Sequence, residues 1–453
     1  MFTHEKLQFL LKQYAAPACF WVAYSGGLDS QVLLYALSRI VPAKRLRAIH
    51  VNHGWHADSM KWVNSCQQTC EKLGIYCDIV FIDAHSKSGE SPEAYAREVR
   101  YGAIAKRISA GDFLLTAHHR NDQAETLLLQ LLRGSGLKGL ACMPFCQTFA
   151  NAYLMRPLLD FTRAELFEYA QKHQLTWIED DSNMNLRFNR NFIRHQILPL
   201  VQQRWPQADK TIARVAANLA EAHSLLDEVA HQDLSEVQGS ESKVLVISKL
   251  LKLSVKRRTN ILRYWLKRLH FPMPSQKQLQ QIDVLLKSRM DASPRFTWGE
   301  GQLRRYRDYL YALRLIENEK KLLNVGFTAW KFGQTITLST LDQLTSKQVI
   351  GTGLSYSLLK EKQVDVAFRR GGERFYPSNR QGSHPLKKLF QEWAIPPWER
   401  NKIPLIYYQK ELIAVAGYDI DPRFAAKQNE LGFVIELVPK LSNAELPINC
   451  LIT

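Results

Sequence analysis

The stretch Ala23-Tyr24-Ser25-Gly26-Gly27-Leu28-Asp29-Ser30 decides the fold of the first part of this chain. An apolar run at residues 19–23 precedes it and predicts a buried strand, and an apolar-periodic run at residues 32–40 follows it and predicts a helix. Ser25-Gly26-Gly27 is therefore expected to form the turn between a strand and a helix N-terminus. Two glycines let the backbone turn tightly and bring its N–H groups close to a ligand.

The same turn is expected to bind phosphate. A helix start presents unpaired N–H donors and the positive end of the helix dipole, and the hydroxyls of Ser25 and Ser30 add further donors. Asp29 has the wrong charge to hold a phosphate alone, but the right one for a Mg²⁺ ion that screens it. No Gly-Lys-Ser/Thr follows, so the loop is not a Walker A motif. An ordinary strand–turn–helix is the alternative, and the full string Ser-Gly-Gly-x-Asp-Ser favours the phosphate site.

Charge is distributed unevenly along the 453 residues. The formal net charge is +17, of which +5 falls on residues 1–210 and +12 on the remainder. This asymmetry favours a nucleic-acid surface outside the first part, and a merely soluble basic protein is the alternative. The seven cysteines lack the spacing of most zinc or iron–sulfur sites. With no secretory segment and no membrane span, they predict reduced thiols in a cytoplasmic protein that does not bind membranes.

The first two hundred residues alternate predicted strands and helices. Strands are expected at 46–51, 77–82, 113–117 and 154–155, and helices at 58–73, from 91 onward, at 123–132 and at 162–172. A Thr162-x-x-Glu165 capping box opens the last of these helices. Repeated strand–helix units with apolar strands imply an α/β fold, a Rossmann-like parallel sheet covered on both faces.

Polar side chains gather where these strands end, and ligands of parallel sheets bind beyond the carboxyl ends of strands. On the helix between the third and fourth strands, Arg97, Arg100 and Tyr101 share one face. The other candidates are Asn52 and His53 after the second strand, and His118, His119, Asp122 and Glu125 after the fourth.

Seven strings occur in order over roughly residues 15–200. They are S-G-G-L-D-S (25–30), H-V-N-H-G (50–54), R-E-x-R-Y (97–101), T-A-H-H-x-x-D-Q-A-E-T (116–126), R-G-S-G (133–136), R-P-L-L (156–159) and R-N-x-I-R (190–194). Together they resemble the tRNA(Ile)-lysidine synthetase family of PP-loop (N-type) ATP pyrophosphatases, in its longer form with extra C-terminal domains. That family often has Asp-Asp where this chain has Asn121-Asp122, so the acidic role is placed on Asp122.

The resemblance implies an enzyme that ligates free L-lysine to C2 of the wobble cytidine, position 34, of the isoleucine tRNA with a CAU anticodon. The reaction passes through an adenylated cytidine, converts ATP to AMP and pyrophosphate with Mg²⁺, and lets the tRNA read AUA as isoleucine. A homodimer is compatible with the family. The loop residues Ser25, Gly26, Gly27, Leu28, Asp29 and Ser30, with Asn52 and His53, are then expected to bind ATP.

The chemistry requires the lysine ammonium to be recognised and to lose a proton, since its pKa is about 10.4 in water. Asp122 and Glu125 lie three apart on one helix face and are expected to clamp the ammonium, one of them serving as base. His118 and His119 are alternative bases, and helix capping is the alternative role for the acidic pair. Arg97 or Arg100 is expected to offset charge on the α-phosphate. The catalytic set is thus Asp29, Arg97, His119, Asp122 and Glu125, with Asp29 and Asp122 as metal ligands.

The remainder of the chain is expected to bind tRNA. We expect a catalytic domain at 1–208, a mainly helical substrate-binding domain at 209–325, a β-leaning linker at 326–361, and a small α+β C-terminal domain at 362–453. Basic residues with interleaved aromatics suit phosphate contact and base stacking, although a solvated helix face is the alternative. The expected RNA-binding residues are Arg190, Arg194, Arg257, Arg258, Arg370, Arg374, Lys387 and Lys388.

Three other functions compete with this one. A PP-loop tRNA thiolase would need a persulfide-forming cysteine or a Cys-x-x-Cys cluster. The sequence has no Cys-x-x-Cys, and its cysteines avoid the strand ends described above. A non-catalytic RNA-binding protein on a decayed scaffold would have lost residues of the Ser25–Ser30 loop, or Asp122 or Glu125. A small-molecule amidotransferase would not need the basic downstream domains.

Overall fold

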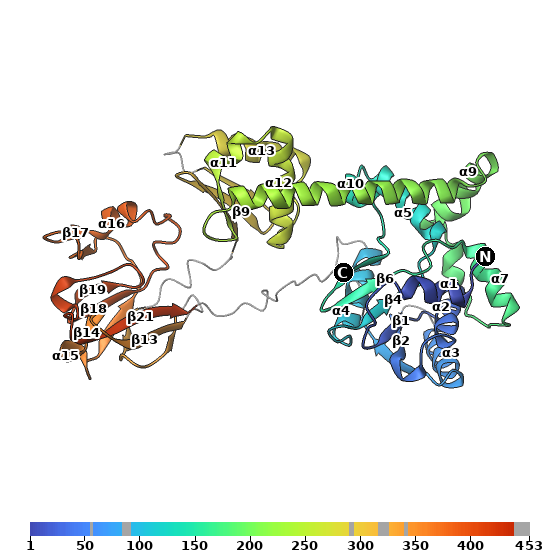
Figure 1. The fold of residues 1–453 in the computed structure, drawn as a ribbon, viewed down its shortest axis with the longest axis horizontal. Coiled ribbons are helices and arrows are strands. Elements are labelled where there is room, and N and C mark those ends of the chain that lie inside the picture. The colour runs from blue at the N-terminus through green and yellow to red at the C-terminus, as the bar shows by residue number, and fades with distance from the viewer. Residues whose placement is uncertain (55–57, 84–91, 290–293, 316–325, 339–342, 439–453) are drawn as a thin grey trace. The chain divides into compact units, whose positions relative to one another are not determined.

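A computed structural model describes residues 1–54, 58–83, 92–289, 294–315, 326–338 and 343–438 (Figure 1). The chain divides into two compact units, Met1–Gln232 and Asp233–Thr453, and each is described by itself. Within the described residues, no helix is both long and apolar enough to cross a membrane.

A six-stranded sheet of order β3-β2-β1-β4-β6-β5 forms the centre of the N-terminal unit. Its first five strands pair in parallel, which confirms the predicted Rossmann-like sheet, whereas β5 pairs antiparallel with β6 at the edge and was not predicted. The strands are β1 (Phe20–Ala23), β2 (Leu46–Asn52), β3 (Tyr76–Phe81), β4 (Phe113–Leu115), β5 (Cys146–Phe149) and β6 (Ala152–Met155).

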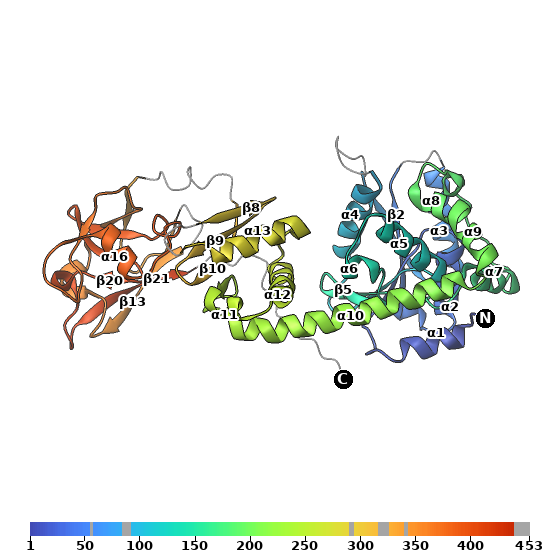
Figure 2. The same ribbon diagram turned by 90° about the horizontal axis from the view of Figure 1, so that it is seen from above.

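Both faces of this sheet are buried, as its continuous apolar strands predict. Val22 belongs to a core with α1, α2 and α7, whereas its neighbour Trp21 belongs to a second core with Ile104 of α4. Figure 2 shows α1 and α2 on one side of the strands and α4 on the other. The helices are α1 (His4–Leu11), α2 (Leu28–Ser38), α3 (Ser59–Lys72), α4 (Pro92–Ala105), α5 (Arg120–Leu132), α6 (Leu137–Leu140) and α7 (Arg163–Lys172).

Local sequence signals fix several helix starts. Gly27 is the N-cap of α2, so the helix begins directly after the glycine turn, four residues earlier than its apolar period indicates. Thr162 and Glu165 form the predicted capping box of α7. After α7 come α8 (Asn189–Phe192), a π-helical turn (Ile193–Ile197), α9 (Leu198–Arg204) and α10 (Ala208–Val237). Helix α10 starts at the expected end of the catalytic domain and continues across the boundary between the two units.

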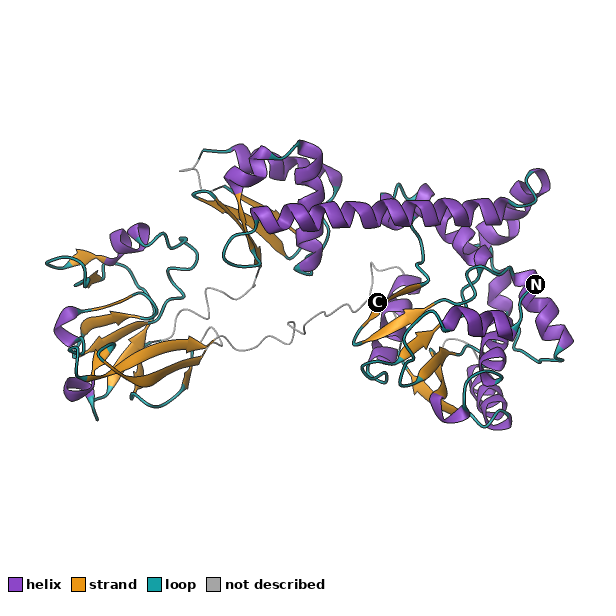
Figure 3. Cartoon of the chain, viewed as in Figure 1, coloured by secondary structure: helices purple, strands orange, loops and turns teal. Residues whose placement is uncertain are grey.

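The first part of the second unit combines helices with a sheet (Figure 3). Helices dominate, as expected for the predicted substrate-binding domain, but an antiparallel sheet of order β7-β10-β9-β8 lies among them and was not predicted. The elements are β7 (Val244–Val246), α11 (Ile247–Lys252), α12 (Val255–Arg268), α13 (Gln276–Lys287), β8 (Arg295–Trp298), β9 (Gly301–Tyr306) and β10 (Tyr309–Arg314).

The last part of the second unit contains two antiparallel sheets that share one apolar core. Trp330, Leu344, Val366 and Phe433 contribute to that core from both sheets. The elements are β11 (Thr328–Trp330), β12 (Ile336–Thr337), β13 (Gln343–Ile350), β14 (Leu354–Ser355), α15 (Tyr356–Leu359), β15 (Val364–Ala367), β16 (Arg374–Phe375), β17 (His384–Pro385), α16 (Leu386–Glu392), β18 (Leu405–Tyr408), β19 (Glu411–Val415), β20 (Asp419–Ile420) and β21 (Leu431–Val438).

The stretch 326–361, expected as a linker, differs from that expectation. Its strand β13 pairs with β21 over the whole of its length, from Gln343↔Val438 to Ile350↔Leu431. Trp330 and Leu344 are 1% and 0% exposed. Because their burial requires residues after 361, the described part of this stretch belongs to the C-terminal fold.

Candidate active site

The glycine turn after β1 is held by its own hydroxyls. The Ser25 and Ser30 Oγ atoms lie 3.0 Å apart, and the Ser30 hydroxyl also donates to the Gly27 carbonyl at 3.0 Å. The Ser25 N–H donates to Ser30 Oγ at 3.3 Å. Leu28 is 5% exposed, so only its backbone is available to a ligand. The turn, which follows the carboxyl end of β1, is thus held in a defined conformation by its own hydrogen bonds.

Gly26 is the position where this turn requires glycine. Its φ is +83°, and a Cβ added there would lie 2.5 Å from Ile178 Cδ1 and 2.9 Å from Cys66 Sγ. The Ile178 N–H donates to the Gly26 carbonyl at 2.9 Å, so the segment after α7 lies directly against the turn. Nothing in the sequence pattern indicated this role of Ile178, because an isolated apolar residue carries no signal of its partner.

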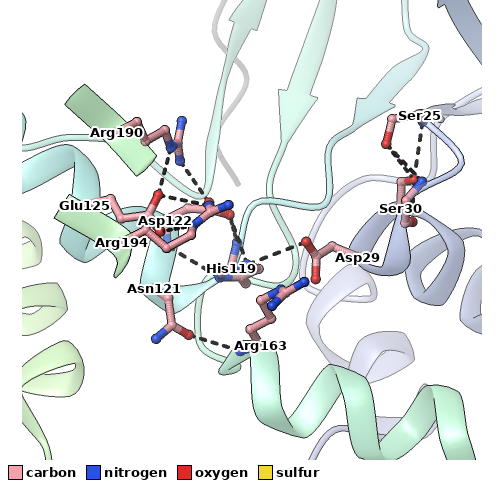
Figure 4. Close-up of polar contacts among 11 residues, drawn as sticks. Ser25, Asp29, Ser30, His119, Asn121, Asp122, Glu125, Arg163, Arg190 and Arg194 are labelled. Carbon is pink, nitrogen blue, oxygen red and sulfur yellow. Dashed lines mark hydrogen bonds and ion pairs between the residues drawn. The ribbon is translucent and has the colours of Figure 1, made fainter. Parts of the chain in front are cut away.

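Asp29 and His119 connect the ends of β1 and β4. His119 is the N-cap of α5, where its Nδ1 accepts the Asp122 N–H at 3.3 Å (Figure 4). The proton of the neutral ring is therefore on Nε2, which lies 3.6 Å from Asp29 Oδ2 and 3.5 Å from Asp122 Oδ2. Burial disfavours the charged ring, but the carboxylates of Asp122 and Asp29 outweigh it and raise the pKa of His119. His119 can thus hold a proton between two acids.

Asp122 and Glu125 form a closed ion-pair network with two arginines. Asp122 Oδ1 accepts from Arg190 at 2.8 Å and from Arg194 at 3.1 Å. Glu125, which is 0% exposed, accepts from Arg190 Nε at 2.7 Å and from Arg194 Nε at 2.6 Å (Figure 4). Burial alone would raise the pKa of Asp122, but His119 and Arg190 lower it to about 2. We call these four residues the carboxylate–guanidinium cluster.

This cluster brings together residues for which the sequence analysis expected different functions, lysine binding for the two acids and RNA binding for the two arginines. The acidic pair expected to clamp an ammonium already accepts hydrogen bonds from both arginines expected to bind RNA. An ammonium at these oxygens would compete with the two guanidinium groups. Asn121 is directed elsewhere, since its Oδ1 accepts the Arg163 N–H at 3.0 Å, and this agrees with placing the acidic role on Asp122 (Figure 4).

The end of β2 contributes neutral groups. Asn52 Oδ1 accepts the Gly54 N–H at 2.8 Å, which fixes the turn after the strand. His53 Nε2 accepts from Arg100 Nε at 3.1 Å, and burial together with Arg100 lowers the pKa of His53 to about 4. His118, beside His119, is neutral as well, because burial lowers its pKa to about 3. Neither ring carries charge at neutral pH.

Two arginines at this edge have no acidic partner among the described residues. Arg97 is exposed on α4 and its guanidinium lies 4.9 Å from the Tyr101 ring centre. Arg156 follows β6, is 3% exposed, and its Nε has no hydrogen-bond partner in the described chain. The sequence string R-P-L-L contained Arg156, but no role was assigned to it. The available signal was an arginine directly after a buried strand.

The predicted RNA-binding residues of the second unit fall into two groups. Arg258 is 6% exposed and donates to Asp283 at 2.9 Å and to the Leu253 carbonyl at 2.6 Å. It therefore stabilises the packing of α12 against α13 and is not accessible to RNA in this structure, contrary to expectation. Arg257 is half exposed and pairs with the buried Asp233. The remaining four are exposed, namely Arg370, Arg374, Lys387 and Lys388.

The residues at the edge fit ATP with a magnesium ion at one of the two expected ligands. Asp29 Oδ1 is buried and has no hydrogen-bond partner in the described chain, as suits an atom that binds a cation. Asp122 fits less well, because both of its oxygens already accept hydrogen bonds. Among the described residues no group of three or more His, Cys, Asp or Glu could hold a metal ion. Mg²⁺ is commonly bound by one or two carboxylates together with substrate phosphates, so Asp29 suffices.

Known protein families and known proteins match most of the chain. Residues 2–201 match the PP-loop domain, 245–311 the TilS substrate binding domain, and 364–437 the TilS substrate C-terminal domain. A tRNA(Ile)-lysidine synthase of Coxiella burnetii is 42% identical over 97% of both chains. One of Serratia proteamaculans is 40% identical over 90% of this chain and 93% of its own. A solved U34-tRNA thiolase of Methanococcus maripaludis covers 48% of this chain and 78% of its own at 19% identity, with a TM-score of 0.40.

Proposed function

The chain belongs to the tRNA(Ile)-lysidine synthase family, and from that premise we propose that it ligates lysine to C2 of cytidine 34 in the isoleucine tRNA with a CAU anticodon. The reaction uses ATP, passes through an adenylated cytidine, and releases AMP and pyrophosphate. The observation that carries the proposal is the near-complete match to relatives of that name, together with a preformed PP-loop beside an acidic cluster at one sheet edge.

The first step joins the α-phosphorus of ATP to O2 of the cytidine and breaks the bond between the α-phosphorus and pyrophosphate. The N–H groups and hydroxyls of residues 25–30 bind the departing pyrophosphate at the start of α2. Asp29 would hold Mg²⁺, and the ion would neutralise phosphate charge. Arg97, exposed and without an acidic partner in the described chain, faces the charge on the α-phosphate.

The second step forms a bond between the lysine side-chain nitrogen and C2 and breaks the C2–O bond, so that AMP leaves with the electron pair. We place the ammonium at Asp122 and Glu125, where it replaces one guanidinium of the carboxylate–guanidinium cluster. A carboxylate of this cluster accepts the proton. His119 is less suited, because its Nδ1 is engaged by the helix cap. The displaced arginine, Arg190 or Arg194, is then available to a tRNA phosphate.

The remaining exposed cations bind the rest of the tRNA. Arg370, Arg374, Lys387 and Lys388 lie on the C-terminal fold, and Arg257 lies on α12. Phosphate contacts of this kind position the RNA without reading its sequence. We keep the proposed division into a catalytic domain up to residue 208 and two tRNA-binding parts, with residues 326–361 assigned to the last.

The test is incorporation of radiolabelled lysine into a transcribed isoleucine tRNA with a CAU anticodon, in the presence of ATP and Mg²⁺. AMP and pyrophosphate release are followed in parallel. We expect labelled tRNA and stoichiometric AMP. Formation of AMP without label would retain the PP-loop chemistry and exclude lysine as the nucleophile. Binding of tRNA with neither product would reject catalysis.

A further inference from the structure

Arg156 is a buried cation without a counter-charge. It is 3% exposed, and its Nη1 donates to the Pro144 carbonyl at 2.8 Å. Its Nε is buried and has no hydrogen-bond partner in the described chain, and no carboxylate is among the groups that act on its charge. A buried charge is strongly unfavourable unless it is paired, and breaking such a pair is costly. The unused Nε donor and the uncompensated charge of Arg156 therefore indicate an anion that the chain itself does not supply.

The surroundings of Arg156 increase this need. The titratable groups that influence it are Tyr101, Arg97 and Cys146, and it in turn acts on His118. None of these is an acid that is charged at neutral pH, and Arg97 is a second cation. Burial, followed by Arg97, lowers the pKa of Arg156. The guanidinium groups of Arg97 and Arg156 thus lie close enough to repel each other, and an anionic ligand would neutralise their charge.

Arg156 lies on the same sheet edge as the acidic groups. Strand β6 pairs with β4, and the Thr116 N–H donates to the Met155 carbonyl at 3.0 Å. The segment after β4 leads to His119, the N-cap of α5, and to Asp122 in its first turn, and the loop after β6 begins with Arg156. Neighbouring strands lie about 4.8 Å apart. Anionic and cationic groups therefore follow two adjacent strands.

We propose that Arg156 binds the α-carboxylate of the lysine substrate, an assignment that rests on the proposed function. Lysine is a zwitterion, and the acidic cluster can receive only its ammonium end. With C–C and C–N bonds of about 1.5 Å, extended lysine separates its terminal nitrogen from its carboxylate by roughly 7 Å. That length exceeds the spacing of about 4.8 Å between adjacent strands, so one lysine can reach groups that follow β4 and β6. Arg97 keeps its proposed contact with the α-phosphate of ATP. The two arginines without an acidic partner in the described chain would then bind two different anions, the α-phosphate and the lysine carboxylate.

The burial of the Arg156 side chain favours a lysine carboxylate over an RNA phosphate as its ligand. A phosphodiester is flanked by two nucleosides and cannot enter a site whose cation is 3% exposed. A carboxylate at the end of a slender molecule such as lysine is smaller than a phosphodiester and has no second flanking group. A planar guanidinium also matches a carboxylate by two parallel hydrogen bonds, and Arg156 retains a free Nε donor for such a pair.

The experiment compares lysine with lysinamide, which lacks the carboxylate, in wild-type protein, Arg156→Gln and Arg156→Lys. KM and kcat for label transfer to tRNA are measured with each nucleophile, and tRNA adenylation is measured without either. Arg47→Gln is the matched control, since Arg47 is an exposed arginine at the opposite end of the same sheet. We expect Arg156→Gln to raise KM for lysine about 10- to 100-fold, the range of a charge-assisted hydrogen bond.

Lysinamide should be used equally by wild type and Arg156→Gln, so the preference for lysine disappears, and Arg156→Lys should restore part of it. Adenylation without lysine should be unchanged. Equal loss with lysine and lysinamide would overturn the proposal and leave a packing role. A change confined to tRNA KM would overturn it in favour of a phosphate contact. Failure of the wild type to use lysine at all would instead reject the proposed function.

Discussion

His119 Nε2 lies 3.6 Å from Asp29 Oδ2, and this contact links the phosphate-binding turn after β1 to the acidic start of α5. The two residues are ninety positions apart in the chain, yet the adjacency of β1 and β4 brings them together. Asp29 Oδ1 has no partner in the described chain, whereas Oδ2 faces His119. The two oxygens of one carboxylate thus differ in their surroundings: Oδ2 faces the histidine, and Oδ1 is the atom that we propose for the cation.

Asp29→Asn should abolish ATP cleavage while tRNA binding persists. The amide removes the charge that a magnesium ion needs and the charge that faces His119. We expect AMP release in the presence of tRNA to fall at least about 100-fold, comparable with loss of a transition-state contact. Filter binding of tRNA should be unchanged. Glu71→Gln, at an exposed acid of α3, is the control, and an active Asp29→Asn protein would remove the metal role.

Gly26→Ala and Gly27→Ala form a matched pair in one turn. At Gly26 the φ of +83° and the Ile178 side chain at 2.5 Å both oppose a Cβ, so we expect a loss of about 2 kcal/mol or more in the free energy of unfolding. At Gly27 the φ is −74° and the nearest atom lies 3.6 Å away. Thermal unfolding should show a lower Tm for Gly26→Ala alone. Similar Tm values for the two variants would contradict the close approach of Ile178.

Glu125→Gln should destabilise the N-terminal unit. Glu125 is fully buried and accepts from both arginines, and removing one partner of a buried ion pair costs about 3–5 kcal/mol. The double variant Glu125→Gln/Arg194→Met should lose less than the sum of the single variants, by about 1–3 kcal/mol. Urea unfolding gives the values. Additive losses would mean that the cluster does not act as a unit.

Acid should weaken the N-terminal unit before its carboxylates titrate. The pKa of His118 is about 3 in the folded chain and about 6.5 when unfolded, so the unfolded state takes up the proton first. The stabilisation is complete above pH 6.5 and decreases as the pH falls from 6.5 toward 3, by about 1.4 kcal/mol per pH unit for one proton. Hydrogen exchange of β4 amides measures this in the intact chain. His118→Gln should reduce the slope by one proton, and an unchanged slope would contradict the burial of His118.

Local sequence rules predicted much of the fold because strand periodicity, capping boxes and the glycine turn act over a few residues. The parallel arrangement of five strands and the position of His119 and Asp122 after the fourth followed from these rules, but the order of the strands did not. Strand β5 and the sheet β7–β10 were missed, since short antiparallel strands have weak periodic signals. The pairing of β13 with β21 joins residues 81 to 95 positions apart, which no local pattern reveals.

The sequence indicated which residue types lie at the candidate site, but not which of these side chains contact one another. Arg190 and Arg194 were expected to contact tRNA phosphates, yet they pair with the two acids expected to face lysine. Which cation meets which anion depends on how α8 packs against α5, a tertiary fact. Arg258 is similar: its basic neighbours suggested a binding surface, whereas Asp283 fixes it in the interior. Burial decides the role, and a single sequence does not display the burial of a charged residue.

The contrast between exposed and buried cations gives a last prediction for tRNA binding. Lys387 and Lys388 are exposed on α16, so Lys387→Gln/Lys388→Gln should weaken tRNA binding and reduce the slope of log affinity against log salt by about 2 if both contact phosphates. Arg258→Gln removes a buried partner of Asp283 and should lower Tm without changing that slope. Lys362→Gln, an exposed lysine of the same fold, is the control for charge alone. A salt slope that changes for Arg258→Gln but not for the lysine pair would place the RNA surface on α12 instead of α16.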